Sequence, residues 1–354
     1  MAQKITLTSG SVFNGNPITF DIKPNIITGT DTDGNTINPT FHRVVVEVTC
    51  GIDSGSFETI KMSSPVETES DSTLVSMDIA SALRTFRDSY EYSALPTTYP
   101  TVSFQVKAYD EYMLDGETHL TGMVYFPSST TYLRTIFGAF SDLDRLTSSG
   151  TKAVKTLTRK PSSMPQIVAV GETLAYTPAY STEQNLADSS ALTGATSKAV
   201  DVVKEGAQTL GYQSVYALPA TEAKNRQQFR FINQYGVLES VSVPRAYSKT
   251  LSVTSTSYAK SIQETFSKFS RAAIHKQNNQ ESWLFTTDPL NEDWLHWYLH
   301  EFLMSEHMWM LINGNWLPCT VSVSDDITFL DRTSGNMQSL SFTAKLDING
   351  SPLL

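Results

Sequence analysis

Two histidines one helical turn apart offer the clearest chemistry in this sequence. His296 and His300 have the i, i+4 spacing with which two imidazoles can bind one zinc ion, and Asp293 lies one turn before them. At about 100° per residue, however, all three side chains fall in the middle of the polar arc of an amphipathic helix. Such a helix needs a solvated face, and the segment contains no HExxH motif. We therefore expect a plain surface here, with no metal and no cofactor.

The other acidic and thiol groups lack the spacing that catalysis requires. Asp31–Asn35 (DTDGN) looks like a calcium loop, but its glycine comes too early for an EF-hand. Asp325 and Asp326 are adjacent, so in a strand they would point to opposite faces. Cys50 and Cys319 lack a convincing histidine partner and suit buried apolar positions, and no GxSxG, GxGxxG or P-loop motif is present. We predict that the chain is not an enzyme.

The same helix raises the question of a protein contact. Trp297 and Met304 fall on the edge of its polar arc, where burial within the domain is not guaranteed. An exposed tryptophan beside an exposed methionine is typical of a protein–protein interface, because both residue types are enriched at interface cores. Trp297 and Met304 are therefore candidate oligomer-interface residues. The alternative is that a loop covers them and that Trp297 belongs to the core.

Helix and hairpin signals follow one another in the tryptophan-rich stretch that contains these residues. The predicted elements of this unit, residues 288–323, are a helix that starts at Asp288-Pro289 or at Asn291 and ends near Met304, a strand over Met308–Ile312, and a strand over Trp316–Val323. Between the two strands, Asn313-Gly314 is the dipeptide that a two-residue type I′ turn requires.

Composition favours a β-rich protein that does not bind nucleic acid or membranes. Only 18% of the 354 residues are charged, while serine, threonine, asparagine and glutamine are plentiful, as on the outer faces of β-strands. A protein that binds nucleic acid needs basic residues to neutralise the backbone phosphates, and the net charge of -10 argues against such binding. No segment approaches about 18 uninterrupted apolar residues, and the N-terminus has no apolar signal region, so we expect neither membrane insertion nor classical secretion.

Apolar residues alternate with polar ones at both ends of the chain, as half-buried strands require. Ile18, Phe20 and Ile22 alternate with polar residues near the N-terminus, and residues 340–348 do so near the C-terminus. The predicted fold is mainly β. An N-terminal β-sandwich of immunoglobulin or fibronectin type (residues 1–146) is followed by a linker (147–165) and a second β-rich domain with one amphipathic helix (166–354). Residues 181–208 read as a long insertion, either a loop or a loosely packed helix.

Four segments of the C-terminal half occur in an order that matches one protein family. They are residues 229–239 (FRFINQYGVLE), Trp283 with residues 291–305, residues 315–321 (NWLPCTV) and residues 338–347. These segments resemble the minor tail or tail-tip proteins of tailed phages and prophages of Bacteroidetes. Cys319 and Tyr235 depart from the family pattern, which has an aliphatic residue and a tryptophan there.

The resemblance implies a non-enzymatic structural subunit of a phage tail tip or baseplate. Such a subunit would form a homo-oligomeric ring and contact other phage tail proteins. It would reside in the virion tail after assembly in the host bacterial cytoplasm, and would bind neither nucleic acid nor membrane. Ring formation needs head-to-tail contacts between copies of the chain.

Two other functions remain open from the sequence. A carbohydrate-binding β-sandwich of a virion or cell surface could stack sugars on Trp297, Trp309 or Trp316 and hold calcium at Asp31–Asn35. A zinc-dependent hydrolase would use His296 and His300 and ranks third.

Overall fold

The computed structural model shows a chain that folds into two compact units. Unit 1 comprises residues 1–157, 177–197 and 234–237, and unit 2 comprises residues 158–176, 198–233 and 238–354. The boundary between residues 157 and 158 falls inside the predicted linker. The structure describes residues 4–9, 13–30, 33, 36–52, 55–67, 73–88, 90, 92, 95–97, 100–114, 116–139, 157–178, 196–211, 213–246, 248–259, 272–323 and 337–346.

Unit 1 is a β-sandwich. One sheet has the order β1-β2-β7, the other has the order β10-β8-β5-β6 with β9 also paired to β8, and β3 pairs with β4. The elements are β1 (Lys4–Ser9), β2 (Thr19–Lys23), β3 (Gly29–Thr30), β4 (Thr36–Ile37), β5 (Phe41–Ile52), β6 (Glu58–Pro65), β7 (Val75–Asp78), α1 (Ala80–Asp88), β8 (Thr101–Leu114), β9 (Glu117–Phe126) and β10 (Leu133–Ile136).

The alternation seen in the sequence places the core of unit 1 between these two sheets. Phe20 and Ile22 of β2 are fully buried, and they pack in one cluster with Val44 and Val46 of β5 and with Phe104 of β8. Because β5 lies between β6 and β8, its apolar run is covered on both edges by other strands. The sequence-based prediction of a mainly β fold is confirmed.

Unit 2 combines one large sheet with two small ones. The large sheet has the order β17-β16-β20-β21-β22-β19-β18, and the small sheets are β11-β15-β14 and β12-β13. The elements are β11 (Gln166–Ala169), β12 (Thr173–Tyr176), β13 (Lys198–Asp201), β14 (Gly206–Leu210), β15 (Gln213–Leu218), η2 (Ala220–Asn225), β16 (Arg226–Ile232), β17 (Leu238–Pro244), β18 (Ser248–Ala259), β19 (Ala272–Thr286), α3 (Glu292–Trp297), η3 (Tyr298–Phe302), β20 (Met308–Ile312), β21 (Asn315–Ser322) and β22 (Ser341–Leu346).

Part of the predicted insertion at 181–208 consists of β-strands, not of a loop or helix. Residues 198–201 form β13 and residues 206–210 belong to β14, so the prediction is wrong for this part. Residues 179–195 lie outside the described part of the chain. β14 finds its partner in β15, a few residues farther along the chain, which the polar composition of the segment did not reveal.

The helix and hairpin of unit 2 form as their sequence signals predicted. The Asn291 side chain caps the helix by accepting a hydrogen bond from the Trp294 amide at 3.1 Å. After α3 the backbone continues as the π-helix η3. At the β20–β21 turn, Asn313 and Gly314 have φ angles of 48° and 80°, as a type I′ turn requires. In the described part of the chain, no helix is both long and apolar enough to cross a bilayer.

Candidate functional site

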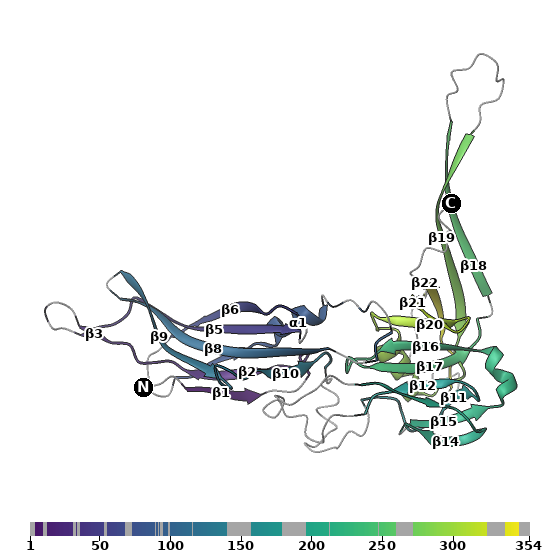
Figure 1. Cartoon of the computed structure of the whole chain (residues 1–354), viewed down its shortest axis with the longest axis horizontal. Coiled ribbons are helices and arrows are strands. Elements are labelled where there is room, and N and C mark those ends of the chain that lie inside the picture. The colour runs from purple at the N-terminus through teal and green to yellow at the C-terminus, as the bar shows by residue number, and fades with distance from the viewer. Residues whose placement is uncertain are drawn as a thin grey trace, which may run out of the picture. The chain divides into compact units, whose positions relative to one another are not determined.

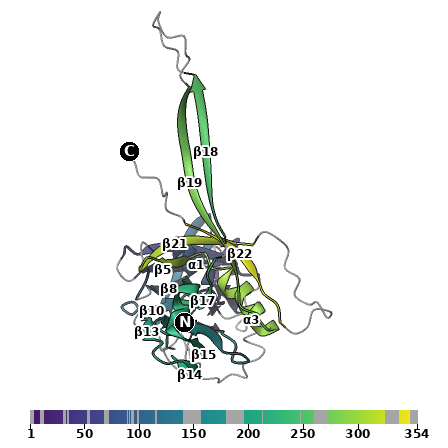
Figure 2. The ribbon, with the colours of Figure 1, turned by 90° about the vertical axis from the view of Figure 1, so that its right-hand side faces the viewer.

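Unit 2 carries a long two-stranded arm made of β18 and β19. These strands have 12 and 15 residues and pair antiparallel from Ser248↔Leu284 at the base to Ala259↔Ala272 at the far end. Figures 1 and 2 show the two strands leaving the other strands of the large sheet. At about 3.3 Å per residue, β19 is roughly 50 Å long.

Only the base of the arm is held by the rest of the sheet. β19 pairs with β22 over Ser282–Thr286, whereas residues 272–281 pair with β18 alone among the described strands. β18 is the last strand of the sheet, so within the described strands its outer edge has no partner along its whole length. The arm therefore presents two open edges of backbone N–H and C=O groups.

Trp297 does not lie on the surface, so the basis for predicting it as an interface residue was wrong. Its side chain is 3% exposed and packs edge-on against Phe231 at 5.7 Å and Trp294 at 5.2 Å between ring centroids. The Lys160 ammonium lies 5.4 Å from the centre of the indole. The alternative of a core tryptophan is the one observed.

Met304 is a surface residue, 72% exposed, just past the end of η3. It borders an apolar hollow of about 420 Å³ on one side of unit 2. The hollow is lined by Leu299, His300, Leu303, Met304, Val321, Ser322 and Val323. The exposed methionine expected at this position is present, and its role in an interface stays a prediction.

The histidine pair lies on the polar face that the helical wheel indicated. Asp293, His296 and His300 are exposed, and the two imidazole rings stack at 5.7 Å with an interplanar angle of 12°. No cluster of three or more metal-ligating side chains occurs among the described residues. Asp31, Thr32, Gly34 and Asn35 of the proposed calcium turn lie outside the described part of the chain.

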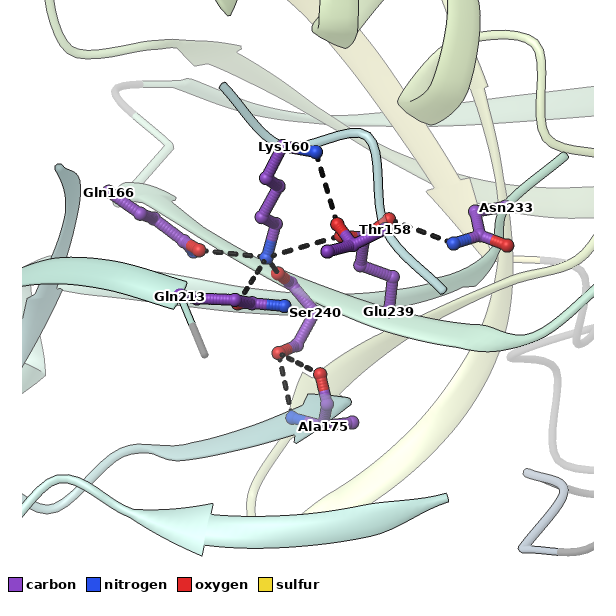
Figure 3. Close-up of polar contacts among 8 residues, drawn as sticks. All are labelled: Thr158, Lys160, Gln166, Ala175, Gln213, Asn233, Glu239 and Ser240. Carbon is purple, nitrogen blue, oxygen red and sulfur yellow. Dashed lines mark hydrogen bonds and ion pairs between the residues drawn. The ribbon is translucent and has the colours of Figure 1, made fainter. Parts of the chain in front are cut away.

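A cluster of charged groups is buried inside unit 2 and was missed by the sequence reasoning. Lys160 and Glu239 lie 3.8 Å apart between Nζ and Oε1, with side chains that are 4% and 2% exposed. Figure 3 shows the Lys160 ammonium enclosed by protein oxygen atoms. It donates to Gln166 Oε1 at 2.8 Å, to Gln213 Oε1 at 3.2 Å and to the Ser240 carbonyl.

The carboxylate of Glu239 has its own set of donors. The Thr158 hydroxyl donates to one oxygen, and Asn233 Nδ2 donates to the other at 3.1 Å (Figure 3). Burial lowers the pKa of Lys160 to about 8, while Glu239 acts in the opposite direction. Because protein groups satisfy both charges away from solvent, the pair suits a structural role rather than contact with a substrate.

A second ion pair comes from the neighbouring residue of the same segment. Arg159 Nη1 lies 2.7 Å from Glu301 Oε1, and the two side chains are 16% and 2% exposed. Farther along, the Met164 carbonyl accepts a hydrogen bond from Trp294 Nε1 at 2.8 Å. Residues 158–164, predicted as part of an exposed linker, thus fasten the helix to the interior of unit 2.

The aromatic side chains proposed for sugar stacking are not free surfaces. Trp309 is 4% exposed, and the half-buried ring of Trp316 is covered by the Arg230 guanidinium at 4.3 Å. Trp297 and Trp309 are therefore buried, and one face of the Trp316 ring is covered by Arg230.

The sequence and the fold were both compared with those of known proteins. No family model, no curated protein and no solved structure matches the chain.

Proposed function

We propose that this chain is a non-enzymatic structural subunit of a phage tail tip or baseplate, which assembles into a ring with copies of itself and with other tail proteins. The observation that supports the proposal is the β18–β19 arm. About ten residues of β19 extend beyond its contact with β22, with only β18 beside them among the described strands. An isolated two-stranded hairpin is at best marginally stable in water, so an arm of this length gains stability from strands of other subunits.

The segments that resemble tail-tip proteins support the same proposal by their location. Residues 229–239 cover most of β16 and the start of β17, residues 291–305 contain the helix, and residues 315–321 and 338–347 contain most of β21 and all of β22. Apart from residues 234–237, which belong to unit 1, the described residues of these segments belong to the large sheet of unit 2 and its helix. In sheet order they lie on one side of the arm, from β17 to β22, and β22 pairs with the base of β19. The resemblance therefore concerns the sheet from which the arm extends.

The proposal is tested by the mass of the purified full chain in solution and by negative-stain microscopy of the same sample. We expect closed oligomers, visible as rings, whose mass is an integral multiple of 39.1 kDa. A strict monomer at all concentrations would contradict ring formation. Retention of a sugar on a glycan array by such a monomer would favour the carbohydrate-binding alternative.

A further inference from the structure

The open edges of the arm differ from the other sheet edges in the described structure. Proteins commonly protect edge strands with charged residues, proline, bulges or short length. In unit 1, the edge strand β6 contains Glu58, Lys61 and Pro65. The edge strand β9 carries a bulge, where Gly122 and Met123 face the single residue Tyr109. The edge strand β14 of unit 2 has only five residues.

The arm has none of these protections over most of its length. β18 contains one charged residue, Lys249 near its base, and the ten residues Thr250–Ala259 include neither a charge nor a proline. β19 contains no proline, and Lys276 is the only lysine or acidic residue in Ala272–Gln280. The single bulge in the arm, between Val253 and Thr254, lies on the inner ladder. An unprotected edge strand is a template for pairing with a strand of another chain.

The two open edges complement each other. β18 and β19 already form an antiparallel ladder of twelve residue pairs inside one arm. The outer edge of β18 is therefore chemically suited to the outer edge of β19 in another copy, because the same two strand sequences meet again in the same orientation. The free stretch of β19, the ten residues 272–281, spans the same part of the arm as the nine residues 251–259 of β18, and the bulge accounts for the extra residue.

We infer that the arm of one copy pairs with the arm of a second copy of this chain, with β18 of the first beside residues 272–281 of β19 of the next, in an antiparallel ladder. This inference rests on the proposed ring-forming function and specifies its contact. Copies related by rotation about an axis parallel to the arms repeat the contact until it closes, so the arms form a barrel in which no edge stays open. A two-fold pairing of β18 with β18 would leave the β19 edge open on both copies.

Two shortened variants test whether the edges make the contact. The arm-shortened variant replaces residues 253–279 by Asn-Gly, which leaves the paired residues Ser252 and Gln280 on either side of a two-residue turn. The matched control replaces residues 260–271 by Asn-Gly between the paired residues Ala259 and Ala272, and it keeps both edges complete. Tryptophan fluorescence of each variant reports whether unit 2 is folded, because all five tryptophans lie within residues 283–316.

Light scattering is expected to give the oligomeric mass for the full chain and for the control, and the mass of a single chain for the arm-shortened variant. If the arm-shortened variant keeps the oligomer, the arm inference is overturned, while the proposed ring survives through another surface. If the control also dissociates, the contact does not depend on the edges and the inference is again overturned. A monomeric full chain would contradict both the inference and the ring.

A cross-linking experiment tests the head-to-tail direction. Leu251 and Glu281 are opposite each other in the arm, and Leu251 is 53% exposed. In the proposed contact, Leu251 of one copy also lies near Glu281 of the next. With a short cysteine-specific cross-linker, L251C and E281C chains are expected to cross-link when co-expressed but not when each is alone. The native Cys50 and Cys319 are 0% and 2% exposed and give little background. Cross-linking of L251C alone would show β18–β18 pairing and overturn the direction.

Discussion

Replacing Lys160 by methionine should remove a pH-dependent part of the stability of unit 2. Burial lowers the pKa of this amine from 10.5 to about 8 in the folded chain. Between these two values the unfolded chain binds the proton and the folded chain does not, so the free energy of unfolding rises with pH. One pKa unit corresponds to about 1.36 kcal/mol, which makes the whole effect about 3 kcal/mol. The gain is complete above pH 10.5 and is lost as the pH falls through 8.

The measurement is urea unfolding of the wild type and K160M, followed by tryptophan fluorescence at a series of pH values. All five tryptophans belong to unit 2, so the signal reports on the unit that contains Lys160. The difference in unfolding free energy, wild type minus K160M, should rise with pH at about 1 kcal/mol per pH unit near pH 9. Titrating groups that do not interact with Lys160 are common to both proteins and cancel in this difference.

Lys249 provides a matched control. It also lies over a tryptophan ring, 5.0 Å from the centre of Trp283, and pairs with Glu281 at 2.8 Å, but its side chain is 52% exposed. An exposed ion pair contributes little to stability. A plot of unfolding free energy against pH for K249M should therefore run parallel to that of the wild type over the same pH range. If K160M also runs parallel to the wild type, Lys160 does not titrate in this window. A difference that falls with rising pH would reverse the sign of the reasoning.

Three further changes test other parts of the structure. Gly122→Ala should lower the melting temperature in calorimetry more than Gly116→Ala does. Both glycines have positive φ, but a Cβ added at Gly122 would collide with Asn25 Nδ2, whereas a Cβ at Gly116 would meet nothing within 4 Å. Equal shifts of the melting temperature would contradict this explanation. Arg159→Met should cost about 3–5 kcal/mol in urea unfolding because it removes the guanidinium that lies 2.7 Å from the buried Glu301 carboxylate, and a loss under about 1 kcal/mol would show that the pair is dispensable. Met304→Glu should change the unfolding free energy by less than about 0.5 kcal/mol and lower the oligomer fraction in light scattering; an unchanged fraction would remove Met304 from the interface.

Local sequence signals predicted those elements whose hydrogen bonds are themselves local. Asn313-Gly314 determines its turn because both residues adopt positive φ without help from distant contacts. The cap at Asn291 bonds an amide three residues away. The polar arc of the helix was also predicted correctly, since His296 and His300 are exposed. In each case the residues that decide the outcome lie within a few positions of one another.

Burial by distant segments was not predictable in the same way. Trp297 sits at the edge of the polar arc, and its cover comes from Phe231 in β16 and from Lys160 in the segment before β11. Lys160 itself lies in a stretch rich in serine, threonine, lysine and proline, which is typical of an exposed linker. Its hydrogen-bond partners lie as far away as Ser240, 80 residues along the chain. No local pattern marks a lysine whose acceptors arrive only when the sheet has formed.

The arm shows how a sequence feature gains meaning only from topology. The run Thr250–Ala259 is uncharged and rich in serine and threonine, and many strands covered by neighbours on both sides have the same character. In the interior of a sheet it would need no protection, because the backbone groups of an inner strand are already paired. At an open edge the same run lacks the charges and prolines that commonly prevent pairing with another chain. The feature on which the proposed assembly rests is therefore present in the sequence, but only the order of the strands reveals it, because missing charges and prolines matter only where an edge is exposed.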